Sequence, residues 1–245
     1  MTAQRDGDRV GLDVGAQTSD NTETKRRTQI LEIANTLIAS TGVRTSIYQI
    51  ADAAGILAGS LYHHFESKEA LLIELFRRYH ATMDRIGTDA LATIDEAQTL
   101  PASELITELG CAIARGAVEN RGALQMSFYE APSTDPDLTE LMHRPPSAIY
   151  AAMLRALRVA KWSGGYLRSD LDLPTLADRF CQTMLHVGLE VIRHDEPSDQ
   201  VATVLCRIML EGLASDFVVD RRVPVGRGDV REHHCHQVRG ISSMR

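Results

Sequence analysis

The chain has 245 residues, 44% of them hydrophobic, and a formal net charge of −7, which suits one large or two small domains with a buried core. It contains no run of about 18 apolar residues, so we expect no membrane span, and its acidic first residues predict no signal peptide. The four cysteines are scattered and form no CxxC pair, which is typical of a reduced, cytoplasmic protein rather than a disulfide scaffold.

The chain begins with a polar stretch that precedes the first helical pattern. Residues 1–22 are rich in Gly, Asp and Thr and predict a disordered arm. From Thr24 to Thr41 apolar residues recur at i, i+3, i+4, i+7 and i+8, which predicts an amphipathic helix that Gly42 ends. Cations at the start of this helix oppose its dipole, so they either meet a phosphate or are merely solvated: Lys25, Arg26 and Arg27.

The next stretch predicts two short helices around a tight turn; residues 45–69 are TSIYQIADAAGILAGSLYHHFESKE. Ser46 can cap the first helix, with Gln49 at capping-box spacing, and Gly55 can end it in the left-handed conformation. The second helix, about 57–64, presents a small polar face of the kind that fits a DNA major groove. We expect DNA contacts from this face and its flanks, at Arg44, Thr45, Ser46, Ala58, Gly59, Ser60, Tyr62, His63, His64 and Lys68.

This stretch resembles the helix-turn-helix of the TetR (tetracycline-repressor-like) family of bacterial regulators. The resemblance covers about residues 24–76 and is carried by Thr45, Ile50-Ala51, Ala54-Gly55, Gly59-Ser60-Leu61-Tyr62, His64-Phe65 and Ser67-Lys68. One departure is Leu57, because the family often has Ser or Thr there as the N-cap of the recognition helix. The base preference of this chain is therefore expected to differ from that of typical members. The alternative is a packed helical hairpin without a DNA role.

The distribution of charge answers the objection that an acidic chain should avoid DNA. Residues 23–85 hold eight Lys or Arg and seven Asp or Glu, which sum to +1. Residues 1–22 sum to −2 and residues 86–245 to −6. The acidity thus lies outside the predicted DNA-binding part, and a locally basic face is what binds phosphates.

Helical patterns continue through the rest of the chain. Ser67 can cap a long helix that runs to about Ile94 and joins the two domains. Further helices are expected at about 103–120 and 124–129, and from Asp135-Pro136 towards Trp162 with a break at Pro145-Pro146. Gly164-Gly165 is expected to end the last of these. No segment has the pattern of a strand, so the chain is predicted to be all-α.

Two long helices, at about 174–194 and 198–219, carry more apolar surface than packing on one side requires. Pairing with their copies in a twofold dimer would bury it in a four-helix interface, and the resemblance implies the same arrangement. The domain limits expected from all of these patterns are 23–66 for the three-helix DNA-binding domain and 67–219 for the helical ligand-binding and dimerisation domain. Residues 220–245 are expected to form a disordered tail.

A ligand site is implied by the resemblance, since regulators of this family usually sense a small molecule in the second domain. Adaptable Met and aromatic side chains suit a hydrophobic ligand, and we expect it near Met83, Cys111, Phe128, Tyr129, Met153, Met184 and His186, although each can equally be ordinary core. The GILAGSLYHHFESKE stretch also resembles regulators of lipid and steroid breakdown. A fatty acyl or steroid compound, or its CoA thioester, is therefore the expected effector.

Other chemistry has little support in the sequence. No GxSxG, HExxH or phosphate-binding loop is present, so we predict neither an enzyme nor a cofactor. Asp170 and Asp172 are expected to serve a turn and a cap. Consecutive residues cannot all wrap one metal ion, so no metal site is predicted at His233, His234, Cys235 and His236.

Two functions remain open at this point. The first is a homodimeric, ligand-responsive transcriptional repressor that a small hydrophobic molecule releases from a palindromic DNA operator. The alternative is an all-α protein-interaction module without operator binding.

Overall fold

The computed structural model describes residues 14–96, 101–129, 133–162, 167–194 and 197–214. These residues are almost entirely helical, which confirms the all-α prediction: α1 (Val14–Thr41), η1 (Gly42–Arg44), α2 (Ile47–Ala53), α3 (Ala58–His64), α4 (Lys68–Glu96), α5 (Ala102–Glu119), α6 (Arg121–Tyr129), α7 (Pro136–His143), α8 (Ser147–Trp162), α9 (Leu173–His194) and α10 (Ser198–Leu213). Within these ranges, extended backbone pairs only in an isolated antiparallel bridge between Leu167 and Ala214. None of the described helices has both the length and the apolarity that crossing a bilayer requires.

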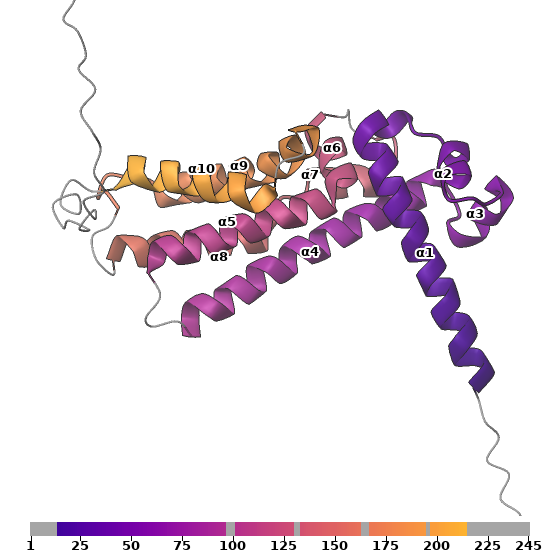
Figure 1. Cartoon of the computed structure of the whole chain (residues 1–245), viewed down its shortest axis with the longest axis horizontal. Helices are drawn as coiled ribbons and strands as arrows, with labels where there is room; N and C mark the ends of the chain where they lie inside the picture. Colours follow the sequence, from indigo (N-terminus) through magenta and orange to yellow (C-terminus); the bar gives the residue numbers. More distant parts are fainter. Residues whose placement is uncertain (1–13, 97–100, 130–132, 163–166, 195–196, 215–245) are drawn as a thin grey trace, which may run out of the picture.

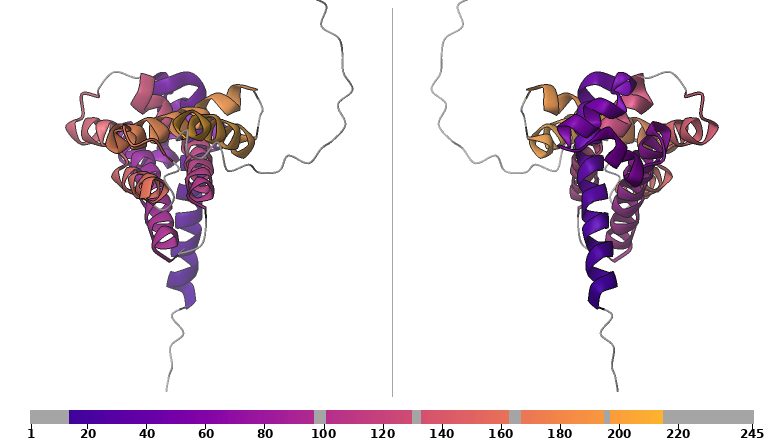
Figure 2. Two further views of the ribbon diagram at one scale, coloured as in Figure 1. Left: turned by 90° about the vertical axis from the view of Figure 1, so that its left-hand side faces the viewer. Right: turned by 90° about the vertical axis from the view of Figure 1, so that its right-hand side faces the viewer.

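The helices are arranged in an elongated molecule with α2 and α3 at one end (Figure 1). From there α4 runs into a bundle built with α5, α8, α9 and α10. The N-terminal part of α1 projects away from the rest of the molecule (Figure 2). The small N-terminal unit and the larger bundle match the two-domain organisation expected from the resemblance.

Local sequence signals determine the geometry of the helix-turn-helix. The predicted capping box is present, since Ser46 Oγ accepts from the Gln49 N–H at 3.2 Å and the Ser46 N–H donates to Gln49 Oε1 at 2.7 Å. Gly55 has φ +65°, the left-handed conformation that lets α2 stop sharply. Apolar side chains behind the turn are fully or almost fully buried: Ile30, Ile38, Ile50, Leu61 and Phe65.

The first helix is longer than the apolar pattern predicts. α1 begins at Val14, within the stretch expected to be a disordered arm, rather than near Thr24. Extending an existing helix costs far less than starting one. The packed part of α1, around Ile30 and Ile38, therefore supports further turns that have no apolar pattern of their own.

Proline and aspartate signals in the second domain act as predicted. Asp135 caps α7 by accepting from the Leu138 N–H at 3.0 Å, with Pro136 at the first helical position. Pro145 and Pro146 separate α7 from α8. Gly164-Gly165 and residues 220–245 lie outside the described residues, and α10 is described only to Leu213.

Helix α5 lies at the centre of the bundle and packs against α4, α8, α9 and α10. Glycines permit its close approaches. A Cβ at Gly188 of α9 would lie 2.2 Å from the Ala117 Cβ, and a Cβ at Gly110 would lie 2.6 Å from Cys206 Sγ. These distances are far below van der Waals contact, so α9 and α10 can sit this close to α5 only because these positions lack a side chain.

Helices α4 and α8 also meet at a glycine. A Cβ at Gly87 would lie 2.3 Å from the carbonyl carbon of Ala148 and 2.6 Å from the Ile149 nitrogen. Both neighbours are backbone atoms at the start of α8, so no side-chain rotation could make room. The long connecting helix therefore presses directly on the backbone of α8.

A second joint links the two domains between α1 and α6, in addition to the covalent link through α4. Asn35 donates from Nδ2 to the Glu119 carbonyl and accepts at Oδ1 from the Gly122 N–H, both at 2.8 Å. Arg121 donates to Thr36 Oγ1 at 2.8 Å. We refer to Asn35 with its two backbone partners as the Asn35 clamp. It fastens α1 to the turn between α5 and α6.

Candidate nucleic-acid interface and ligand region

The outer face of α3 is a polar surface with a glycine near its start. Gly59, Tyr62 and His63 are exposed, and Ala58 and Ser60 are half-buried. Arg44 is exposed just before α2, and Lys68 is half-buried at the start of α4. Residues from the second helix of the turn and from its flanks thus present the donors and small side chains that a major groove requires.

Two of the predicted contact residues stabilise the turn. Thr45 is only 1% exposed, and its hydroxyl donates to the Gly42 carbonyl at 2.8 Å and bonds to the Thr41 hydroxyl. This burial moves Thr45 from the predicted contact surface to the layer that supports it. The hydroxyl of Ser46 is occupied by the capping box.

Two of the cations at the start of the packed part of α1, Arg26 and Arg27, contact protein groups and are not merely solvated, whereas Lys25 is exposed. Arg26 donates to the Ala54 carbonyl at 3.0 Å. Arg27 lies over the Phe65 ring at 4.3 Å, donates to the His64 carbonyl and pairs with Glu74 at 3.7 Å. Together they fasten the ends of α2 and α3 to α1 and α4.

His64 also faces inward at this joint. Its Nδ1 shares a hydrogen bond of 2.6 Å with Glu23 of α1, and its side chain is only 12% exposed. A surface pocket of about 460 Å³ opens beside it, lined by Arg27, His63, His64, Phe65, Glu66, Ala70, Ile73, Glu74 and Arg77. His64 therefore orients α3 as well as bordering its outer face.

The residues predicted for a ligand site make their contacts in different parts of the bundle. Phe128 of α6 and His186 of α9 form an aromatic pair with ring centroids 4.2 Å apart, and Tyr129 lies next to Phe128 at 6.3 Å and is half-exposed. The sulfur of Met184 lies 3.8 Å from Cys206 Sγ, near Gly110.

The other three predicted ligand residues belong to separate parts of the core. Cys111 faces α10, where its thiol lies 3.3 Å from Thr203 Oγ1. Met83 and Met153 are completely buried, the former against the Gly116 position of α5. The structure thus brings together the aromatic group at α6 and α9, and separates it from the sulfur-containing group between α5, α9 and α10.

The buried thiols have the character of core groups. Burial raises the pKa of the Cys181 and Cys206 thiols to about 12, so both are protonated at neutral pH. Cys111, Cys181 and Cys206 form no disulfide among the described residues. Cys235 and the neighbouring histidines lie outside the described residues, and within the described ranges no group of His, Cys, Asp and Glu side chains could hold a metal ion.

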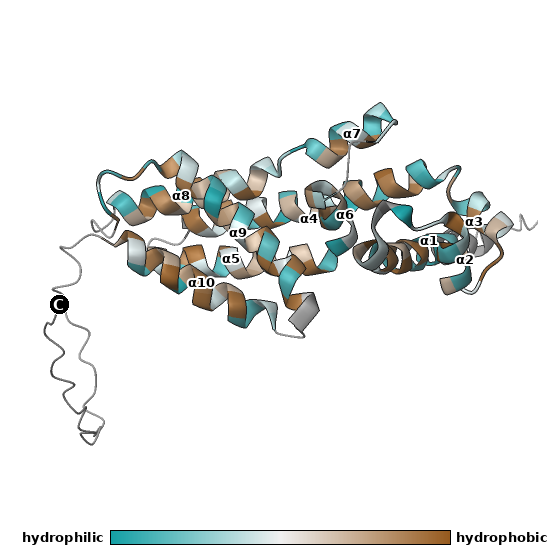
Figure 3. Cartoon of the chain, turned by 90° about the horizontal axis from the view of Figure 1, so that it is seen from above, coloured by the Kyte–Doolittle hydropathy of each residue, from teal (hydrophilic) through white to brown (hydrophobic). Residues whose placement is uncertain are grey.

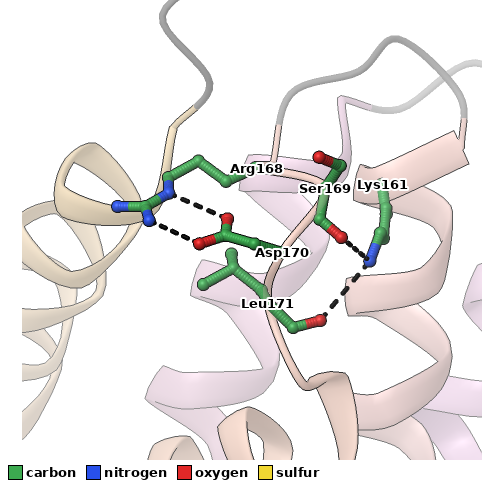
Figure 4. A network of polar contacts seen from close by, with 5 residues as sticks. All are labelled: Lys161, Arg168, Ser169, Asp170 and Leu171. Atoms are coloured by element: carbon green, nitrogen blue, oxygen red, sulfur yellow. Dashed lines mark hydrogen bonds and ion pairs between the residues drawn. The ribbon is translucent and has the colours of Figure 1, made fainter.

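The acidic residues before α9 serve the loop, as predicted. Figure 4 shows Asp170 paired with Arg168 at 2.6 Å, and Lys161 donating to the carbonyls of Ser169 at 2.9 Å and Leu171 at 3.4 Å. The guanidinium of Arg168 holds the pKa of Asp170 below its ordinary value. The Asp172 side chain accepts from Thr175 in the first turn of α9. These are the contacts of a tethered turn rather than of an acid–base pair.

Helix α10 keeps an exposed apolar strip, which consists of Val201, Val204, Leu205 and Ile208. Val204 is 46% and Ile208 58% exposed, and a surface pocket of about 400 Å³ runs beside Gln200, Val201, Val204 and Leu205. The spacing i, i+3, i+4, i+7 puts the strip on one face of the helix. Figure 3 shows α10 at the edge of the bundle opposite α7, with apolar turns along it.

Comparison with known proteins agrees with this geometry. The sequence profile described as "Bacterial regulatory proteins, tetR family" matches residues 30–75. The chain is 34% identical over 211 residues to the HTH-type transcriptional repressor KstR2 of Rhodococcus jostii (strain RHA1), which covers 80% of this chain and 96% of that protein. It is 53% identical over 204 residues to KstR2 of Mycobacterium tuberculosis (strain ATCC 25618 / H37Rv), covering 79% and 95%.

A solved structure gives the same relationship. The ketosteroid transcriptional regulator KstR2 of Mycobacterium tuberculosis superposes with a TM-score of 0.59 over 78% of this chain and 96% of that one, with 26% identity. This identity is lower than the 53% of the sequence alignment. The 34% identity to the Rhodococcus relative, over 80% of this chain and 96% of that protein, is sufficient on its own to show the family. The chain belongs to the TetR family of bacterial transcriptional regulators.

Proposed function

We propose that this protein is a ligand-responsive transcriptional repressor that binds a palindromic operator as a homodimer and leaves it when a small hydrophobic molecule binds. The family membership and the repressor relatives support the general function. Within this chain, the observation that carries DNA binding is the glycine at position 59. A cytoplasmic location follows from access to chromosomal DNA.

Gly59 lies inside a seven-residue helix, where glycine destabilises by about 1 kcal/mol relative to alanine. Nothing among the described residues requires it, because a Cβ there would have no neighbour within 4 Å and φ is not positive. A missing side chain does permit close approach of the helix backbone to another molecule. On the outer face of a recognition helix, that molecule is DNA.

The Gly59→Ala variant should therefore separate folding from DNA binding. Its free energy of unfolding should stay equal to that of the wild type or rise by up to about 1 kcal/mol. Its operator affinity should fall by roughly tenfold or more, because the new methyl group meets a base edge. The operator would come from selection in a random duplex library, and affinity from fluorescence anisotropy. Unchanged affinity in Gly59→Ala would contradict the proposed docking face. Failure of the wild-type protein to enrich any sequence would favour an interaction module.

The effector is proposed to be a steroid-derived or fatty acyl compound, free or as its CoA thioester. One support is the description of the M. tuberculosis relative as a ketosteroid regulator. Another is the aromatic pair of Phe128 and His186 at the joint of α6 and α9, because α6 carries one side of the Asn35 clamp. An apolar ligand at this pair would act on the element that holds the DNA-binding domain.

Linkage gives a quantitative test of this proposal. If an effector weakens operator binding by some factor, the operator must weaken effector binding by that same factor. The corresponding coupling free energy is typically about 1–3 kcal/mol. Steroid and acyl CoA thioesters would be titrated calorimetrically into the protein with and without operator DNA. Equal affinities in the two titrations would eliminate a compound as the inducer. Free CoA is the control that isolates the contribution of the apolar part.

Dimerisation is proposed to occur through α9 and α10, as the sequence predicts. The exposed apolar strip on α10 supports this assignment, since Val204 and Ile208 stay 46% and 58% exposed in the isolated protomer and Val201 and Leu205 are only half-buried. Twofold symmetry then pairs each strip with its own copy.

A further inference from the structure

Leu57, the residue before α3, serves neither the helix nor the core. It occupies the N-cap position but makes no side-chain hydrogen bond there, whereas Ser, Thr, Asp or Asn would bond a free helix N–H. The residue is 79% exposed. Among the described residues, the neighbours Ile56 and Ala58 both pack against the core and Leu57 does not. The reason for a large apolar side chain at this point therefore lies outside the protomer.

The position of Leu57 at the start of the recognition helix indicates which chemical group of the DNA it contacts. It directly precedes Ala58, Gly59 and Ser60, and the N-terminal residues of a recognition helix are the ones that contact base edges. Gly59 lets this end of the helix come close to DNA, as argued above. An aliphatic side chain gains nothing from a phosphate. Among the groups that bases expose in the major groove, the apolar one is the 5-methyl of thymine.

We propose that Leu57 is a specificity-determining residue that packs on the 5-methyl group of one thymine in each operator half-site. The inference rests on the proposed function, because it requires operator binding. The polar residues of α3, such as Ser60 and His63, supply hydrogen bonds to the groove, and Leu57 adds an apolar contact that distinguishes thymine from cytosine and uracil. A Ser or Thr at this position would cap the helix but would not make that distinction as strongly.

The test is a double-mutant cycle in which the Leu57 side chain and the thymine methyl group are removed separately and together. Operators selected from a random duplex library with the wild-type protein would be resynthesised with each dT replaced in turn by deoxyuridine, which removes only the methyl. For the wild type, the replacement at one position per half-site should lower the affinity about fourfold, because each buried carbon contributes about 0.8 kcal/mol. Making the replacement in both half-sites should lower the affinity about 15-fold. For Leu57→Ala the same replacement should change affinity by less than about twofold.

Three controls separate the contact from other effects. Tyr48, on α2, is 70% exposed and is the matched apolar control: Tyr48→Ala should keep the wild-type ratio between dT and deoxyuridine, even if it weakens all sites. Thermal unfolding should show that Leu57→Ala folds normally, as its exposure predicts. 5-Methylcytosine placed at the sensitive position should recover part of the affinity lost with unmodified cytosine.

The outcomes distinguish the two levels of the proposal. A library that yields no enriched sequence overturns the repressor function itself. An operator that binds well but tolerates deoxyuridine everywhere overturns the role of Leu57 and leaves the repressor function standing. A methyl dependence that persists unchanged in Leu57→Ala also overturns it, because another residue then makes the contact.

Discussion

Replacing Ile208 by Asp should convert the protein to a monomer and remove high-affinity operator binding. In the isolated protomer Ile208 is 58% exposed, so the charge costs little there. In the proposed dimer each copy would bury an unpaired carboxylate, at a cost of several kcal/mol per site, and the twofold symmetry applies this cost twice. The expected change in the dimer dissociation constant is at least about a thousandfold, measured by sedimentation velocity at micromolar concentration.

The choice of residue and control makes this test specific. Leu205, on the same strip, is half-buried in the protomer, so an Asp there would also damage the fold. Trp162, on α8, is 73% exposed and lies outside the strip, so Trp162→Asp should remain dimeric. A dimeric Ile208→Asp protein would place the interface elsewhere, and a monomeric one that still binds the full operator tightly would contradict the link between assembly and DNA binding.

Replacing Gly87 by Ala should destabilise the protein by roughly 1–3 kcal/mol, the usual cost of overpacking a core. The new Cβ would lie 2.3 Å from the Ala148 carbonyl carbon, and neither backbone can rotate away. α4 must then separate from α8. Chemical denaturation would give the change in the free energy of unfolding, and circular dichroism would confirm that the helices remain.

Gly212 on α10 is the matched control, because a Cβ there would have no neighbour within 4 Å. The free energy of unfolding of Gly212→Ala should equal that of the wild type or exceed it by up to about 1 kcal/mol. If Gly87→Ala matched this control, α4 and α8 would not be in the close contact described. Since α4 also leads to the DNA-binding domain, operator affinity of Gly87→Ala should be measured at a temperature where it is fully folded.

Features fixed by neighbouring residues were predictable from the sequence. The Ser46 capping box, the left-handed Gly55 and the break at Pro145-Pro146 each depend on chemistry within a few residues, and the structure has all three. The lack of a cap at Leu57 was equally visible. These signals were enough to place the recognition helix and most helix boundaries.

Features that depend on distant partners were not predictable. Periodicity indicates that Met83, Met153 and Met184 are buried, but not which helix each one faces. The acceptors of Arg26 and Arg27 lie 28 and 37 residues away, so charge near a helix start suggested phosphate or solvent instead. Thr45 is buried because it follows the 3-10 turn η1 and its hydroxyl bonds to the carbonyl of Gly42, a contact that has no sequence signature.

The Asn35 clamp limits how the DNA-binding domain can move. A domain attached only through α4 could move in more directions than one that is also fixed to the turn between α5 and α6. A shift of α6 would therefore be transmitted through the clamp to α1, and from there to the recognition helix. In the proposed symmetric dimer, movements of both recognition helices would change their spacing and their tilt together, so a small displacement at the clamp would be enough to put both out of register with successive major grooves.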